Sequence, residues 1–267
     1  MPDNRIQQVC VVSLPEDTER REHVKRHFTE IGIDNFTFSD GVAYNSQAVK
    51  QFYLSNRVKA PPNCFRCNQR SCSCPNNILI PQQVANWLAF KKAWVKAAIH
   101  EGLTMICEDD VLFYPGAMGL LSLALDKINL QTEEPLLIRM GHSGLDTQVS
   151  LLEKQEVNIT QAVVMSNVAF ILNQAMARLL LSRFVAIETT SDIFIHNWAA
   201  KFERVNAYTI EPLLATDLSY NKDYAKFVSR IHPKGIDETD TQKMQTHVKR
   251  ANTAKEYQLL LNIWMNT

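Results

Sequence analysis

Short apolar runs alternate with amphipathic segments along most of this 267-residue chain. Continuous apolar runs at residues 9–14 and 103–107 are typical of the buried strands of a parallel sheet. Residues 17–31, and the segment that begins at Pro81, space their apolar residues three or four apart and so predict helices. This alternation predicts an α/β fold with a mostly parallel sheet and helices on both faces.

The same two periodicities predict the remaining elements. We expect further strands at residues 36–38, 136–140, 162–172 and 208–214, and further helices at residues 174–184, 192–202 and 257–265. Residues 45–81 lose this periodicity and hold most of the cysteines, which predicts a Cys-rich loop insertion. The expected domains are residues 1–215, including the insertion, and an extension at 216–267 that ends in an amphipathic helix.

The composition argues against several classes of protein. With 46% hydrophobic residues, the chain can bury a sizeable core. Lys plus Arg equals Asp plus Glu, at 28 each, so the chain lacks the positive excess that nucleic-acid binding needs. It has no apolar run of about eighteen residues and no apolar signal-peptide core near Met1. We therefore expect a cytoplasmic, reduced protein without a membrane span, and peripheral membrane association stays open.

Three consecutive acids, Glu108, Asp109 and Asp110, separate the apolar runs at 103–107 and 111–113. Carboxylates at the end of a buried strand repel one another and lose hydration. A divalent cation would offset both costs, because Mg²⁺ and Mn²⁺ prefer carboxylate oxygens and bridge to nucleotide phosphates. Such folds also open their ligand crevice at the carboxyl ends of strands. The alternative is an acidic turn exposed to solvent.

A second signal is the spacing of four cysteines, Cys64, Cys67, Cys72 and Cys74. Four thiols this close together can close a tetrahedral zinc site with Zn–S bonds of about 2.3 Å. Protein ligands would fill all four positions, so the zinc would hold the loop and not do chemistry. Disulfides are a second interpretation, which a reduced compartment disfavours, and free thiols are a third.

Four segments, in order along the chain, resemble glycosyltransferase family 25, which includes bacterial lipopolysaccharide and collagen galactosyltransferases. They are V-S-L-P-E-D-T-E-R-R at 12–21, F-S-D-G at 38–41, the helix at 84–94 with M-I-C-E-D-D-V at 105–111, and A-F-I-L at 169–172 with S-D at 191–192. The ordered set is more specific than any single motif. One departure is the helix before the acids, where the family usually has a Ser-His pair and this chain has V-A-N-W-L-A.

The resemblance implies a GT-A-type fold that transfers a sugar, with galactose as one candidate, from a nucleotide-sugar such as a UDP-sugar to a glycan or another hydroxyl acceptor. It also implies Mn²⁺ or Mg²⁺ on the diphosphate and inversion at the anomeric carbon. Asp110 and Glu108 would hold the cation, and Asp109 would orient metal-bound water or the donor sugar. Asp192 would take the proton of the acceptor hydroxyl. The donor-binding residues would be Leu14, Arg20 and Asp40.

Each of these roles has a structural alternative. Asp40 would form a simple Asp-Gly turn, Arg20 would lie on a solvated helix face, and Asp192 would cap a helix. Spacing alone adds three histidines as further candidate cation ligands, which are His142, His196 and His232.

Two other functions stay open at this stage. The missing Ser-His pair suggests a non-catalytic member that binds a nucleotide-sugar or a glycan. The cysteine spacing suggests a zinc-stapled interaction module in which the acids form only a surface turn.

Overall fold

The computed structural model describes residues 3–70, 72–143, 156–202, 204–219, 226–231 and 247–266. The chain divides into two compact units, each built from three segments. The sheet unit comprises Met1–Asp40, Phe90–Arg183 and Asp192–Phe227. The cysteine unit comprises Gly41–Ala89, Phe184–Ser191 and Val228–Thr267. The domain boundary that we expected after residue 215 stays a prediction.

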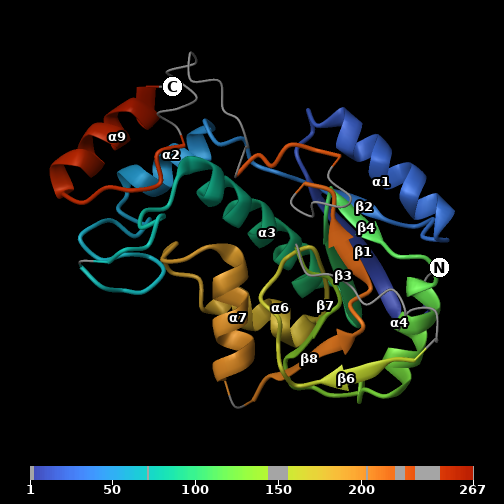
Figure 1. Cartoon of the computed structure of the whole chain (residues 1–267). Coiled ribbons are helices and arrows are strands. Elements are labelled where there is room, and N and C mark those ends of the chain that lie inside the picture. The colour runs from blue at the N-terminus through green and yellow to red at the C-terminus, as the bar shows by residue number, and fades with distance from the viewer. Residues whose placement is uncertain are drawn as a thin grey trace. The chain divides into compact units, whose positions relative to one another are not determined.

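The sheet unit is built on a seven-stranded sheet with the strand order β2-β1-β3-β7-β5-β8-β6 (Figure 1). Its strands are β1 (Ile6–Ser13), β2 (Thr37–Asp40), β3 (Leu103–Glu108), β5 (Leu136–Arg139), β6 (Asn158–Thr160), β7 (Ala169–Asn173) and β8 (Asn206–Glu211). Only β7 and β6 run antiparallel to their neighbours, so five of the seven strands share one direction. This confirms the predicted α/β fold with a mostly parallel sheet.

Five of the seven named helices match the sequence periodicity, whereas those at residues 47–54 and 117–126 were not expected. The seven are α1 (Thr18–Glu30), α2 (Gln47–Leu54), α3 (Pro81–Ile99), α4 (Ala117–Asp126), α6 (Gln174–Ser182), α7 (Ser191–Lys201) and α9 (Ala254–Asn266). Among the described residues, no helix is both long enough and apolar enough to cross a membrane.

Alternate residues of the central strands face opposite sides of the sheet. On one side, Met105 of β3 belongs to a buried core that includes Phe28 of α1 and Leu121 of α4. On the other side, Phe170 of β7 stacks with Phe90 of α3, with ring centroids 6.2 Å apart. Helices therefore cover both faces, as the strand–helix alternation predicted.

Two features of the strands in the sheet unit also differ from the sequence expectation. The strand expected at 162–172 is right only at its end, because β7 begins at Ala169 and the preceding strand, β6, ends at Thr160. The residues between them are bound by Thr209 of β8, whose hydroxyl accepts from the Val164 N–H at 3.1 Å and donates to the Ala162 carbonyl at 2.8 Å. In addition, β4 (Val111–Phe113) and β9 (Ala215–Asp217) form a separate antiparallel pair. Three-residue strands are too short for periodicity to reveal.

The cysteine unit packs its two shorter helices together. Tyr53 of α2 lies 5.6 Å from Trp264 of α9, measured between ring centroids. α9 confirms the expected amphipathic end, because Tyr257, Leu260 and Trp264 are buried on one side. The expectation of a loop throughout 45–81 is wrong at its start, where α2 forms with Ser46 as its N-cap. The described residues from 55 to 70 and from 72 to 80 form none of the named helices or strands.

Gly102, just before β3, provides a test of the fold. Its φ is +92°, and an added Cβ would lie 2.2 Å from Gln7 Oε1, which accepts the Leu103 N–H at 2.7 Å. We expect Gly102→Ala to lower the free energy of unfolding by about 1–2 kcal/mol, because a positive φ strains any residue with a Cβ. Urea unfolding measures this difference. The control is Gly119→Ala in α4, where the added Cβ meets nothing within 4 Å. Equal losses in both variants would contradict the prediction.

Candidate functional site

Several strands bring the candidate residues to one edge of the sheet. The register pairs Ser13 with Asp40 and Val12 with Glu108, so the carboxyl ends of β1, β2 and β3 lie side by side. β7 runs antiparallel to both β3 and β5, so β5 ends at this same edge with Arg139 as its last residue. Open α/β sheets bind their ligands at edges of this kind.

Asp109 and Asp110 are buried in the turn between β3 and β4. One guanidinium nitrogen of Arg20, in α1, lies 2.8 Å from Asp109 Oδ1 and 3.1 Å from Asp110 Oδ2. The other nitrogen donates to Ser219 Oγ at 2.9 Å, and that hydroxyl donates to Asp110 Oδ2. Arg20 is therefore buried against the acids, and the solvated-face interpretation of this residue is wrong.

The β4–β9 pair adds a buried acid that the sequence analysis missed. Asp217, the last residue of β9, pairs in register with Val111, directly after the acidic turn. Its Oδ1 accepts the Ser219 N–H at 2.9 Å. The available signal was an acid that closely follows the apolar run at 213–215, which resembles the pattern at Glu108.

Burial and neighbouring charges raise the pKa values of two carboxylates at this edge, Glu108 and Asp110. Burial raises the pKa of Asp110 to about 6, against the opposing charge of Arg20. Loss of hydration and four neighbouring carboxylates raise the pKa of Glu108 well above its ordinary value. Those neighbours are Asp109, Asp110, Asp192 and Asp217. A bound cation would relieve this repulsion, because added positive charge favours ionised carboxylates.

Two buried histidines of α1 hold the strand that follows the acids. His23 Nε2 lies 3.0 Å from the Val111 carbonyl oxygen, and the Phe113 N–H donates to His27 Nε2 at 2.9 Å. Burial lowers the pKa of both imidazoles, that of His27 to about 4. Both are therefore neutral at pH 7 and fix β4 against α1.

Asp40, at the end of β2, is joined to the end of β1 by Arg21. The Arg21 guanidinium lies 2.6 Å from Asp40 Oδ1 and donates to the carbonyl oxygens of Ser13 and Leu14 at 3.1 Å each. The hydrogen bond from Arg21 lowers the pKa of the exposed Asp40 carboxyl. The structure thus brings together two of the predicted donor-binding residues, Leu14 and Asp40.

Arg139 is a fully buried cation at the same edge, and the sequence analysis missed it because it ends an apolar run. Its guanidinium lies 4.8 Å from the centroid of the Phe170 ring and donates to the Ser166 carbonyl oxygen. Its Nε and one terminal nitrogen have no hydrogen-bond partner among the described residues. Burial lowers the pKa of Arg139 to about 10, although the negative charges of Asp192 and Glu108 act to raise it.

Asp192 lies in the first turn of α7 and is half-buried. The negative charge of Asp192 raises the pKa of Glu108 and opposes the lowering of the Arg139 pKa. Asp192 therefore belongs to the charge environment of this edge of the sheet. A carboxylate in the first turn of a helix fits a structural role at the positive end of the helix, and its interaction with the charge of Glu108 fits a catalytic role.

The three candidate histidines do not add a cation site among the described residues. His142 is half-buried after β5, where its backbone N–H donates to the Ala215 carbonyl oxygen at 3.2 Å and loss of hydration lowers the pKa of its imidazole. His196 lies on α7, and His232 lies outside the described residues.

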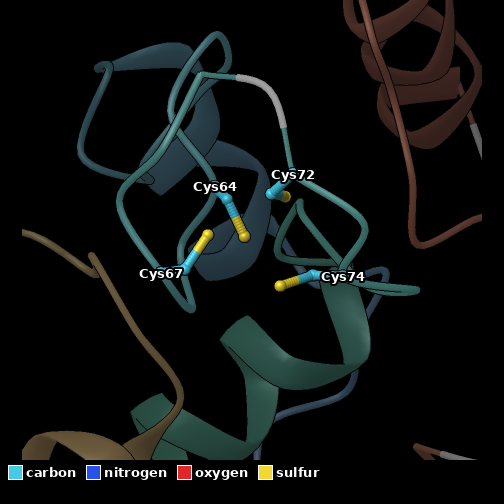
Figure 2. A group of neighbouring side chains, drawn as sticks. All are labelled: Cys64, Cys67, Cys72 and Cys74. Atoms are coloured by element: carbon cyan, nitrogen blue, oxygen red, sulfur yellow. The ribbon is translucent and has the colours of Figure 1, made fainter.

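One group in the described part of the chain is arranged to hold a metal ion. The sulfur atoms of Cys64, Cys67, Cys72 and Cys74 all lie within 4.8 Å of one another and surround a common space (Figure 2). A tetrahedral zinc with bonds of about 2.3 Å needs sulfur atoms slightly closer than this. The described acidic residues form no comparable group of three or more converging ligands.

A tight turn supports the first cysteine pair. The Arg66 N–H donates to Cys64 Sγ at 3.3 Å, and the Asn68 N–H donates to the Cys64 carbonyl oxygen at 2.9 Å, with Asn68 at a φ of +60°. Burial raises the pKa of the Cys64 thiol, but hydrogen bonds from the N–H groups of Cys67 and Arg66 outweigh it and lower the value to about 7. The thiolate is the form that binds metals.

Comparison with known protein families gives one match. The family model described as "Glycosyltransferase family 25 (LPS biosynthesis protein)" matches residues 6–195, which is most of the chain. The chain belongs to glycosyltransferase family 25. No curated protein matches it.

For this family 25 glycosyltransferase, the match confirms the resemblance seen in the sequence. The matched span contains Asp40, the acidic turn, the four cysteines and Asp192, whereas Asp217 follows it. The structure places the predicted acids and the predicted donor-binding residues at one edge of its sheet. The individual roles of these residues stay predictions.

Proposed function

We propose that this family 25 glycosyltransferase moves a sugar, with inversion, from a nucleotide-sugar such as a UDP-sugar to a hydroxyl of a glycan or another acceptor. The observation that carries the proposal is the group of carboxylates at the carboxyl edge of the sheet. Burial, together with the negative charge of neighbouring carboxylates, raises the pKa values of Glu108 and Asp110 there. A divalent cation that accompanies a donor diphosphate would be complementary to this charge.

Glu108 and Asp110 are the residues that we propose to hold Mn²⁺ or Mg²⁺, with Asp109 orienting metal-bound water or the donor sugar. Once bound, the cation would stabilise the charge on the departing nucleoside diphosphate. Arg20 would serve the donor site by fixing the acids, since it pairs with Asp109 and Asp110. The donor would lie over the ends of β1 and β2, where Leu14 and Asp40 are found.

The proposed reaction needs a base on the acceptor side. The acceptor oxygen forms a bond to the anomeric carbon while the bond from that carbon to the diphosphate oxygen breaks. The proton of the acceptor hydroxyl passes to the Asp192 carboxylate. Support comes from the half-buried position of Asp192 at the start of α7, beside the acidic edge.

A second candidate is a member that binds a nucleotide-sugar without turnover. Leu88 and Ala89 lie in the stretch of α3 where the family usually has its Ser-His pair. A screen of nucleotide-sugars for binding and for donor hydrolysis distinguishes the two candidates, because a binding-only member would take up a donor and not cleave it.

We expect Asp110→Ala to abolish sugar transfer and Mn²⁺-dependent donor binding while the fold survives, because Arg20 keeps its ion pair with Asp109. Calorimetry with UDP-sugars, with and without Mn²⁺, measures binding, and donor turnover measures activity. The matched control is Glu101→Ala, which removes an exposed acid before β3 and should retain both. Unchanged turnover in Asp110→Ala would overturn the catalytic interpretation.

We expect Asp192→Asn to lower turnover by about 100-fold or more and to leave donor affinity nearly unchanged, because a base acts on the acceptor hydroxyl. Steady-state kinetics and donor titration of the same preparation measure both. If this variant loses thermal stability but keeps normal turnover per folded molecule, Asp192 is only a helix cap.

We infer further that the four cysteines hold one structural zinc. Support comes from the close approach of the four sulfur atoms and from the turn that surrounds Cys64. Four thiolates prefer a soft or borderline ion such as zinc and leave no open position for chemistry. The same four ligands would restrict a segment with little regular structure of its own.

We expect the purified protein to contain about one zinc per chain. Replacing Cys67 and Cys72 by Ser should release the zinc and make residues 45–81 sensitive to proteases, while Mn²⁺-dependent donor binding persists. Elemental analysis and limited proteolysis measure these effects. Ser73→Ala is the control, because it alters an exposed side chain between two of the ligands. Absence of zinc from protein prepared without chelators would defeat the inference.

A further inference from the structure

The two halves of the cysteine cluster are supported in different ways. The pair Cys64 and Cys67 has its own local turn, described above. The backbone of the second pair is bound by a residue far along the chain. The Arg250 guanidinium donates to the carbonyl oxygen of Cys72 at 2.7 Å and also to that of Cys74. Sequence separations of 178 and 176 residues make this a tertiary contact.

The neighbours of Arg250 continue this contact along the cysteine segment. The N–H groups of Asn77 and Ile78 donate to the Lys249 carbonyl oxygen at 2.9 and 3.2 Å. The Asn77 side chain donates to the Ala251 carbonyl oxygen at 2.9 Å and accepts the Ala251 N–H at 3.0 Å. We call residues 249–251 the strap. Its backbone groups find their partners in the segment that carries the cysteines.

The strap leads directly into α9. Thr253 and Glu256 form a capping box, since Thr253 Oγ1 accepts the Glu256 N–H at 3.1 Å and Glu256 Oε2 accepts the Thr253 N–H at 3.4 Å. The helix then buries Trp264 against Tyr53 of α2. α9 is therefore held at two places, by its own packing on α2 and by the strap at its start.

The strap brings a positive charge close to the cysteine cluster, which carries negative charge when zinc is bound. Four thiolates and one Zn²⁺ carry a net charge of about −2. Arg250 places a guanidinium against the backbone of two of the ligands, and its planar fork donates to both carbonyl oxygens at once. Groups that orient metal ligands from outside the coordination sphere commonly affect metal affinity about 10–100-fold.

We propose that zinc binding at the four cysteines and docking of the carboxy-terminal segment, residues 247–266, are coupled, with Arg250 as the residue that connects them. Zinc fixes Cys72 and Cys74 in the arrangement that the Arg250 fork recognises. The docked fork in turn holds these two ligands in place for zinc. Thermodynamic linkage then requires that zinc binding favours docking of this segment by the same factor as docking favours zinc binding. The proposal rests on the zinc inferred above and is independent of sugar transfer.

The test uses the full chain and two measurements that do not depend on activity. Zinc affinity is measured by competition with a chromogenic chelator, and hydrogen exchange of the α9 amides is measured with zinc and after its removal. The variants are Arg250→Gln and the conservative Arg250→Lys. The matched control is Arg70→Gln, which removes one positive charge from an exposed side chain in the same cysteine segment.

We expect Arg250→Gln to weaken zinc binding about 10-fold or more. Arg250→Lys should fall between this variant and wild type, because it keeps the charge and loses the fork. Arg70→Gln should match wild type. Removing zinc should speed amide exchange in α9 of the wild-type protein, and the same treatment should change exchange less in Arg250→Gln.

Two results would overturn the coupling while leaving the zinc site intact. One is equal zinc affinity in Arg70→Gln and both Arg250 variants. The other is α9 exchange in the wild-type protein that does not respond to zinc removal. A wild-type protein that binds no zinc would instead overturn the metal site, and the coupling with it. If Arg250→Gln does not fold, Arg250→Lys against Arg70→Gln decides the question.

Discussion

The buried ion pairs of Arg20 with Asp109 and Asp110 are the interaction on which the rest of the site depends. Both carboxylates lie in a tight turn, and burial would strongly disfavour their charged forms without a cation nearby. Removing one partner from a buried pair of this kind typically costs about 3–5 kcal/mol, because the other charge is left uncompensated. Arg20 also binds Ser219 and so links α1, the acidic turn and the segment after β9. Arg20 balances only part of the negative charge at this edge, where Arg139 is a second buried cation.

The protein combines two groups of anionic ligands with different chemistry. The carboxylates at the sheet edge offer hard oxygen atoms, which suit Mn²⁺ or Mg²⁺ and the phosphates of a donor. The four cysteines offer soft sulfur atoms in a closed set, which suits zinc and leaves no position for a substrate. Each group belongs to one compact unit, the acids to the sheet unit and the cysteines to the cysteine unit. In our proposals, Mn²⁺ or Mg²⁺ therefore takes part in sugar transfer, and zinc supports the structure.

Local patterns predicted much of the fold and part of the site. The apolar runs that form β1 and β3 are contiguous, so their burial and their carboxyl ends could be read directly. The strand expected at 162–172 starts only at Ala169, and Thr209, on another strand, binds residues before it. Asp217 was missed because its strand has three residues and gains its place only by pairing with β4. Arg139 was missed because its place at the end of an apolar run does not indicate which side chains surround it in the folded protein.

The sequence by itself determined much of the strand–helix order, the acidic turn after β3, the cysteine spacing and the family. All of these are properties of contiguous residues, and local sterics, periodicity and ligand spacing are sufficient to define them. Only the tertiary structure decided which distant groups share a charge environment. It brought Arg20 to the acids and Arg250 to the carbonyl oxygens of Cys72 and Cys74. Electrostatic and hydrogen-bond energies depend on distance in space, so partners separated by many residues become apparent only once the chain is folded.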